Sequence, residues 1–230
     1  MINASKFQVL SFDCYGTLID WERGIVEALM PVLSARHIGL SDEQVLELYA
    51  ELEAEAEQGS YVKYREVLRR VVQQLGSKLG FVPYASELDC IADSLKSWIP
   101  FPDTVEALET LKRRFRLAII SNIDDDLFAF SAQHLKVEFD WVITAEQVKA
   151  YKPSSDPFEY AIDRVGLSTE RMLHIAQSIY HDIVPAKAVG LSTVWVNRRK
   201  GKSGPGAIPP AQGQPDLEVT DLKALVTILG

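Results

Sequence analysis

A chain of 230 residues with 47% hydrophobic residues is long enough to bury a substantial core, which excludes an intrinsically disordered chain. Its formal net charge of −8 argues against a nucleic-acid partner, because binding to the phosphate backbone requires clustered Lys and Arg. We expect the one basic cluster to lie on the solvated surface, beside a segment rich in Gly and Pro: Arg198, Arg199, Lys200 and Lys202.

Cysteine content and hydropathy point to the compartment. Cys14 and Cys90 are too few for a disulfide framework, which favours a reducing environment. Residues 1–12 hold no apolar stretch long enough for a signal peptide, and no later run approaches a membrane span. We therefore expect a cytoplasmic protein without a membrane partner, and the sequence leaves a homodimer open.

The first predicted element is a buried strand over residues 7–12, and Asp13 follows it directly in the segment Asp13-Cys14-Tyr15-Gly16-Thr17-Leu18. A carboxylate at the end of a central strand lies where open α/β sheets bind ligands, and Gly16 lets a ligand approach the backbone closely. Asp13 is therefore a candidate nucleophile; the alternative is a turn residue or a helix cap. Cys14 should face away from the site, because neighbours in extended chain point to opposite sides.

Residues 19–98 show the spacing of helices throughout. Apolar residues recur at helical intervals over residues 21–35, from Ser41 onwards, over 64–79 and over 88–98, and no strand pattern interrupts them. The pattern predicts a helical cap inserted after the first strand. The core domain would then comprise residues 1–18 and 99–230.

Strands and helices alternate after residue 102. A helix over 103–114 precedes a strand over 117–120, and the later expected segments are strands over 139–143, 172–176, 193–196 and 217–219 and helices over 156–165 and 184–189. Such alternation predicts parallel βαβ units, and hence an α/β fold with a doubly wound sheet. We expect residues 201–215 to form a surface loop that does not pack.

Three further segments carry polar groups at strand ends or in loops. Ser121 and Asn122 end the strand over 117–120 and could donate to an anion, although such residues often only start a turn. Lys152 precedes Pro153 in a loop, where a lone lysine is usually exposed.

The last of these segments follows the strand over 172–176 and holds Gln177, Ser178 and Asp182. Asp182 could orient Lys152 or activate a water molecule. Its alternative role is to cap a helix that begins at Ile183.

Together these segments resemble the haloacid dehalogenase superfamily of hydrolases, over nearly the whole chain. Members begin with a strand that ends in Asp-x-(Asp or Tyr)-Gly-Thr-Leu and use the first Asp as covalent nucleophile. The resemblance implies a Rossmann-like core with a cap, and catalytic roles for Asp13, Lys152 and Asp182. Lys152 matches the lysine of the family's Lys-Pro motif, which implies that its ammonium lies close to Asp13. Burial favours a protonated Asp13, whereas an ammonium about 4 Å away favours the carboxylate by roughly 4 kcal/mol, so we expect Lys152 to keep Asp13 ionised. It also implies a substrate-binding set of Tyr15, Thr17, Ser121, Asn122, Gln177 and Ser178.

Two departures from the family's phosphatases distinguish between its branches. Tyr15 stands where those phosphatases carry a second Asp that protonates the leaving alcohol, and a phenol is a poor acid at neutral pH. Gln177 replaces a carboxylate that binds magnesium. The chain is thus similar to the metal-independent 2-haloacid dehalogenase branch, which implies attack at carbon, an aspartyl ester and no cofactor.

The resemblance is incomplete around the substrate. The dehalogenase branch carries an arginine early in the cap, whereas this chain has Glu51, Glu53, Glu55 and Glu57, which a solvated helix face would explain. The alternative is that one of them holds the ammonium of a substrate such as a cyclic imino acid whose ring is opened. Phe158 also replaces a pocket tyrosine. Two other functions stay open: a Mg²⁺-dependent phosphatase with metal ligands Asp13, the Tyr15 carbonyl and Asp182, and a catalytically silent binding protein.

Overall fold

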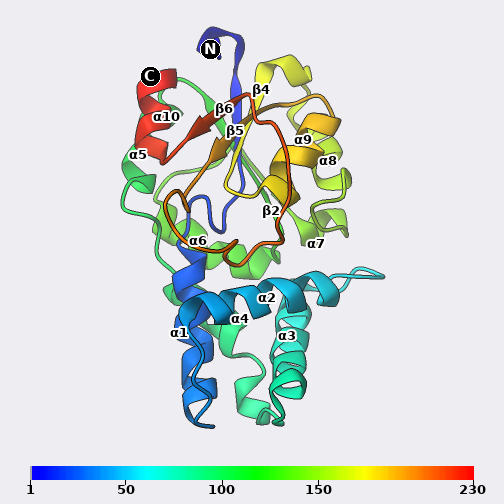
Figure 1. The fold of residues 1–230 in the computed structure, drawn as a ribbon. Helices are drawn as coiled ribbons and strands as arrows, with labels where there is room; N and C mark the ends of the chain where they lie inside the picture. Colours follow the sequence, from blue (N-terminus) through cyan, green and yellow to red (C-terminus); the bar gives the residue numbers. More distant parts are fainter. Residues whose placement is uncertain (1) are drawn as a thin grey trace.

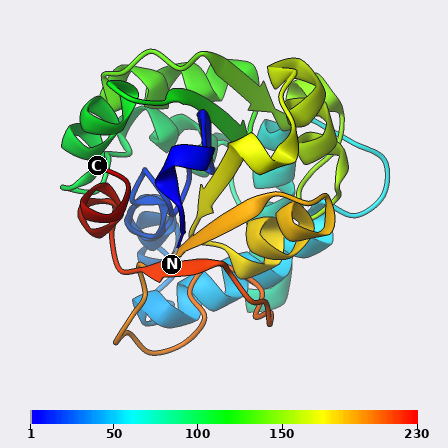
Figure 2. The ribbon, with the colours of Figure 1, turned by 90° about the horizontal axis from the view of Figure 1, so that it is seen from above.

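The computed structural model describes residues 2–230 and contains a six-stranded parallel sheet with helices on both faces (Figures 1 and 2). The strands lie in the order β3-β2-β1-β4-β5-β6. Their bounds are β1 Val9–Phe12, β2 Arg116–Ser121, β3 Trp141–Thr144, β4 Met172–Ala176, β5 Ser192–Val196 and β6 Leu217–Val219. The predicted doubly wound α/β fold is confirmed.

The two faces of the sheet are buried against different helices. Leu10 and Phe12 of β1 belong to a hydrophobic cluster that includes residues of α5 (Thr104–Lys112), α6 (Asp125–Leu135) and α10 (Leu222–Leu229). Val9, on the opposite face, packs in a second cluster with α8 (Asp156–Val165) and α9 (Val184–Ala188). Because both faces are covered, all four residues of β1 are buried, which explains its continuous apolar sequence.

Four further helices lie together beyond one edge of the sheet: α1 (Trp21–Ser34), α2 (Asp42–Ala56), α3 (Tyr64–Leu79) and α4 (Cys90–Ser94) (Figure 1). The chain enters and leaves this group at adjacent points. The Asp20 amide donates to the Ile99 carbonyl at 3.0 Å, and the Phe101 amide donates to the Leu18 carbonyl at 3.0 Å. This arrangement supports our proposal that residues 19–98 form a cap on a core of residues 1–18 and 99–230.

The second cap helix begins where the sequence indicates, because Ser41 and Gln44 form a reciprocal capping box. The helix predicted over 88–98 is shorter than expected. It ends at Ser94 and continues as a 3₁₀ turn, Leu95–Ser97. The hydroxyl groups of Ser94 and Ser97 donate to backbone carbonyls three residues back, at 2.7 and 2.6 Å, and so compete with regular helical bonding.

Arg198 and Arg199 of the basic cluster do not lie on the solvated surface, contrary to the prediction. The guanidinium group of Arg198 donates to the Thr17 carbonyl at 2.9 Å and to Asp103 at 2.8 Å, and its side chain is only 9% exposed. Arg199 pairs with Glu22 of α1 at 2.6 Å. These arginines therefore tie the chain after β5 to the loop after β1 and to the first cap helix.

The loop over residues 201–215 also packs more closely than predicted. Ala207 and Ile208 are buried, and the Ala207 amide donates to Glu22 at 3.4 Å. Irregular backbone carries no periodic signal, so the sequence did not reveal this contact.

No helix within residues 2–230 is both long and apolar enough to cross a membrane.

Replacing Arg198 with Leu leaves the Asp103 carboxylate without its guanidinium partner. We expect the free energy of unfolding, measured by urea denaturation, to fall by about 3 kcal/mol. The exposed Lys200 provides the control, since Lys200→Leu should change that free energy by less than about 0.5 kcal/mol. Equal effects of the two substitutions would contradict the buried role of Arg198.

Candidate active site

Three neighbouring strands bring polar residues together at the carboxyl-terminal ends of the strands. Asp13 follows β1, Ser121 ends β2, and the turn after β4 carries Asp182. In the parallel register, Phe12 of β1 lies opposite Ile119 of β2 and Ile175 of β4, so the three strand ends point the same way. The order of strands reverses at β1, and such a switch point is where open α/β sheets bind ligands.

Lys152, from the loop before α8, joins the two carboxylates. Its ammonium nitrogen lies 2.9 Å from Asp13 Oδ1 and 2.6 Å from Asp182 Oδ1, and it also donates to the Ile120 carbonyl at 2.9 Å. The Lys152 side chain is only 2% exposed. All three of its hydrogen-bond donors therefore have partners, which buried charge requires.

The two carboxyl groups respond differently to this shared cation. Burial raises the pKa of Asp13 above its ordinary value, and Lys152 opposes this shift only in part. Burial also acts on Asp182, but Lys152 and the hydrogen bond from His174 hold its pKa below its ordinary value. The pKa of Lys152 is raised, because the two carboxylates outweigh the effect of burial. Lys152 thus lies where the sequence predicted and favours the charged form of Asp13, but Asp182 shares the ammonium and adds a like charge that raises the pKa of Asp13.

Short local contacts fix both partners of this ion pair. The Thr17 hydroxyl donates to Asp13 Oδ2 at 2.7 Å and accepts from the Gln177 amide at 2.9 Å. Asn122 holds the backbone of Lys152 from both sides, accepting from its amide at 2.7 Å and donating to its carbonyl at 2.9 Å. In the structure Asn122 therefore holds the loop that carries Lys152.

Asp182 does not cap a helix that begins at Ile183, which was the alternative reading. It lies inside a π-helical turn, Ile179–Ile183, whose N-cap is Ser178, with the Ser178 hydroxyl accepting from the His181 amide at 2.8 Å. Asp182 Oδ1 instead pairs with His174 Nε2 at 3.0 Å. The buried carboxylate is thus anchored in the core while it faces Lys152.

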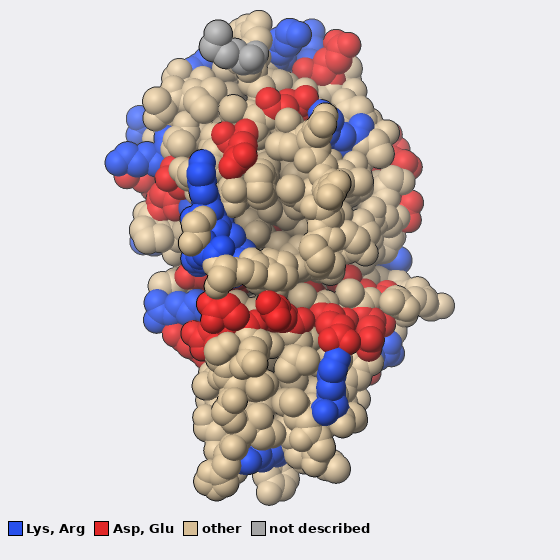
Figure 3. Space-filling view, in the orientation of Figure 1, with Lys and Arg blue, Asp and Glu red and all other residues tan. Residues whose placement is uncertain are grey.

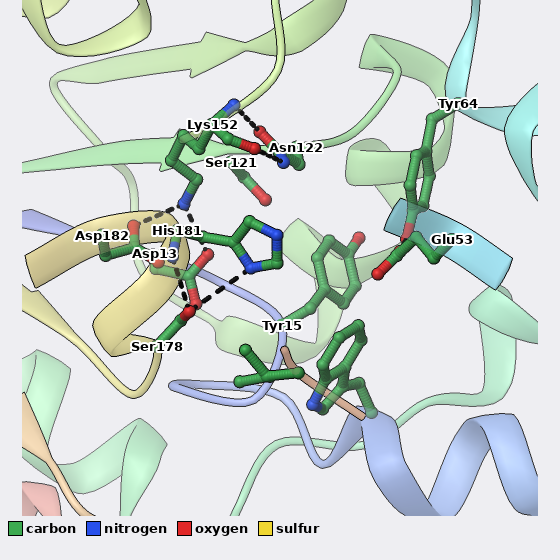
Figure 4. A pocket seen from close by; sticks show the side chains of 12 residues that line it. Asp13, Tyr15, Glu53, Tyr64, Ser121, Asn122, Lys152, Ser178, His181 and Asp182 are labelled. Atoms are coloured by element: carbon green, nitrogen blue, oxygen red, sulfur yellow. Dashed lines mark hydrogen bonds and ion pairs between the residues drawn. The ribbon is translucent and has the colours of Figure 1, made fainter. Parts of the chain in front are cut away.

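A cavity of about 40 Å³ adjoins this cluster (Figure 4). That space holds roughly three water molecules, which suits a small ligand. Core residues and residues of the proposed cap both line it: Asp13, Tyr15, Trp21, Glu53, Tyr64, Ser121, Asn122, Lys152, Ser178, His181, Asp182 and Ile208. Figure 4 shows the Lys152 cluster on one side of the view, Glu53 and Tyr64 on the other, and Tyr15 and His181 between them.

Most sequence-predicted site residues meet at this cavity, but three positions lie elsewhere. Thr17 contacts Asp13 from behind the cavity wall. Gln177 lines a neighbouring cavity with Gly16, and its backbone carbonyl accepts from Trp195. Phe158, expected as a pocket residue, is fully buried in the core, with its ring packed edge-on against His174 at 5.1 Å between centroids. Cys14 is buried in the hydrophobic core, on the side away from the cavity, as predicted.

Sequence reasoning missed several lining residues. His181 lies one position before Asp182 and was passed over; burial lowers its pKa to about 4, so its imidazole is neutral near neutral pH. Trp21 and Tyr64 are the first residues of α1 and α3, and Ile208 comes from the irregular loop. The helix starts could have been noticed, because a cap that covers a site presents its helix ends or faces to that site. Ile208 carried no signal.

This geometry defines the class of protein: an α/β enzyme with a buried carboxylate and lysine at the switch point of its sheet, at a cavity that is also lined by helices of the proposed cap. Comparison with known proteins then gives the family. The sequence profile of the haloacid dehalogenase-like hydrolases matches residues 7–190. The chain belongs to this family of hydrolases.

Individual relatives agree with this assignment. The chain is 28% identical over 225 residues to an (S)-2-haloacid dehalogenase of Pseudomonas sp. strain YL, covering 95% of this chain and 93% of that protein. It is 28% identical to a glyceraldehyde 3-phosphate phosphatase of Methanothermobacter thermautotrophicus, covering 81% and 84% of the two chains. The fold matches that of L-2-haloacid dehalogenase from Xanthobacter autotrophicus with a TM-score of 0.81, at 22% identity and with 97% and 98% covered. These matches favour a hydrolase over a silent binding protein.

Two substitutions should move the pKa of Asp13 in opposite directions. Lys152→Met removes the cation that stabilises the charged form, so the pKa of Asp13 should rise further. Asp182→Asn removes a like charge and leaves the ammonium to Asp13 alone, so this pKa should fall. Carbon-13 NMR titration of the Asp13 carboxyl measures both shifts, and shifts in the same direction would contradict the shared-cation arrangement.

Proposed function

We propose that the protein hydrolyses a small organic molecule by displacement at carbon, through an ester on Asp13. The observation that carries this proposal is the placement of Asp13 at the cavity, with Lys152 on one carboxyl oxygen and Thr17 on the other. Fixed hydrogen bonds of this kind hold a nucleophile in one orientation for attack. The curated relative that dehalogenates 2-haloacids supports a halogenated substrate.

The proposed reaction has two steps. An oxygen of Asp13 forms a bond to the substrate carbon while the carbon–halogen bond breaks, and halide leaves with the electron pair. Water then attacks the ester carbonyl, which releases the alcohol and one proton and restores the Asp13 carboxylate. Ser121 is available to bind the substrate, since its hydroxyl is buried and has no hydrogen-bond partner within residues 2–230.

Tyr15 suits a wall of the cavity better than a proton donor. Its hydroxyl is engaged with Ser131 of α6 at 2.8 Å, and burial raises its pKa well above the usual value. A halide leaving group needs no proton, so displacement at carbon places no demand on this position.

Two cavity side chains are available to accept the proton of the attacking water. Asp182 is a carboxylate whose Oδ1 already accepts from Lys152 and His174. His181 is a neutral imidazole whose Nδ1 lies 3.3 Å from the Ser178 hydroxyl. We propose that Asp182 mainly positions Lys152, which leaves His181 as the group with the freer lone pair.

A magnesium-dependent phosphatase is the second candidate, and the phosphatase among the curated relatives favours it. Its metal ligands would be Asp13, the Tyr15 carbonyl and Asp182. No group of three or more His, Cys, Asp or Glu side chains in the described part of the chain is arranged to hold a metal ion. Gln177, the amide at the expected carboxylate position, lines the neighbouring cavity. These residues fit a magnesium site poorly, and we propose that no metal cofactor is required.

We further propose that the protein works in the cytoplasm. Cys14 and Cys90 are free thiols, as suits a reducing compartment. Homodimerisation stays a prediction.

An ester on Asp13 predicts where solvent oxygen goes. In a single turnover with bromoacetamide in water enriched in oxygen-18, the label should enter the Asp13 carboxyl group rather than the product, because water attacks the ester carbonyl. Mass spectrometry of the peptide that contains Asp13 makes the measurement. Label found only in the alcohol would mean that water attacks the substrate directly, and Asp13→Asn should abolish turnover.

Chelation separates the two candidate reactions. We expect bromide release to be unchanged by an excess of chelator or by added Mg²⁺, since the proposed halide displacement at Asp13 needs no metal ion. Loss of turnover with chelator and its recovery with Mg²⁺ would instead favour the phosphatase, with a phosphate monoester as the parallel substrate.

A further inference from the structure

One glutamate of α2 differs from its neighbours. Glu51 and Glu55 are exposed, whereas Glu53 is 4% exposed and lines the cavity that holds Asp13. Burying a carboxyl group costs free energy unless hydrogen-bond or charge partners compensate for the lost water.

The partners of Glu53 satisfy only half of its carboxyl group. Tyr49 donates to Oε1 at 2.8 Å and Tyr64 donates to the same oxygen, while no described residue donates to Oε2. Figure 4 shows this carboxyl group pointing from α2 towards Tyr15, into the cavity. Burial raises the pKa of Glu53 to about 7, so the carboxylate form predominates in mildly alkaline solution.

Aromatic rings surround the same part of the cavity. Tyr15, Trp21 and Tyr64 all line it, and the Trp21 ring packs edge-on against Tyr49 at 5.9 Å between centroids. Aromatic faces attract cations through their quadrupole, and a carboxylate beside such rings completes a site for an ammonium group. The part of the cavity lined by the proposed cap therefore combines a carboxyl group with aromatic rings.

The charges of the cavity point the same way. Asp13, Asp182 and Glu53 supply three carboxyl groups, and among the described lining residues Lys152 alone is cationic. Its ammonium is already shared between Asp13 and Asp182. A ligand carboxylate would therefore meet net negative charge without a free cation to balance it.

The outer surface repeats this bias. Figure 3 shows Asp and Glu side chains gathered in a band over α2, on the cap side of the crease between the two parts of the molecule. The exposed acids of α2 are Asp42, Glu43, Glu47, Glu51 and Glu55. Such a band adds negative potential on the cap side of the crease, while Figure 3 also shows Lys and Arg side chains on the core side.

We propose that Glu53, with the rings of Tyr15, Trp21 and Tyr64, forms a subsite for a protonated amine of the substrate. The substrate would then present its reacting carbon to Asp13 and its ammonium to the proposed cap. This inference deepens the proposed function and rests on it for the identity of the reacting group. It assigns this chain to amine-bearing substrates rather than to simple haloacids.

Binding of three unreactive ligands of equal length tests the subsite without any chemical step. Propylammonium, propionamide and propionate are titrated calorimetrically into the wild-type protein, at a pH above the pKa of Glu53, which is about 7. We expect propylammonium to bind most tightly and propionate most weakly. Glu53→Gln should weaken propylammonium binding by about tenfold, equivalent to about 1.4 kcal/mol, whereas Glu55→Gln, the same change on the exposed face, should alter it by less than about twofold.

The outcomes are distinct. Tighter binding of propionate than of propylammonium to the wild-type protein would overturn the subsite, even if Glu53→Gln failed to fold. Equal effects of Glu53→Gln and Glu55→Gln would also overturn it. The proposed function is tested separately by the label on Asp13: label without ammonium preference removes only the subsite, and ammonium binding without label removes only the displacement chemistry.

Discussion

The shared ammonium of Lys152 is the interaction on which the site and much of its surroundings depend. Asp13 directly follows β1 and Asp182 lies in the π-helical turn after β4, and both would be costly to bury as charges without this cation. One lysine thus joins the end of β1 and the turn after β4 with the loop before α8. The same contacts that stabilise this edge of the sheet also arrange the candidate nucleophile, so stability and chemistry cannot be separated here.

Sharing one cation between two carboxylates divides their roles. Asp182 lies nearer to the ammonium and also pairs with His174, so it keeps its charge and holds Lys152 in place. Asp13 receives the weaker share, which leaves its pKa raised and its carboxylate less stabilised. A nucleophile that is held but not over-stabilised suits displacement at carbon, because the charge it loses on forming an ester costs less.

The helices of the proposed cap supply a different set of cavity residues from the core. Core residues supply the reacting group, whereas Trp21, Glu53 and Tyr64 come from the helices of the proposed cap. On the function proposed above, selection among substrates would depend on these helical residues rather than on the strand-end motifs. This separation lets one mechanism serve different substrates, since the helices can vary in sequence while the strand ends keep their geometry.

The sequence by itself determined the parallel sheet, the run of helices over residues 19–98 and the approach of Asp13 and Ser121, because strand periodicity is local and parallel strands end at one edge. The approach of Lys152 and Asp182, which lie in a loop and in a turn, was expected from the family resemblance. Only the tertiary structure placed Gln177 in a neighbouring cavity and Phe158 in the core. It also showed which of the four glutamates, Glu53, lines the cavity. Arg198 and Ile208 are largely buried, which the sequence did not indicate. These outcomes depend on how separate segments pack, and neither helix position nor loop composition records which neighbour covers a side chain.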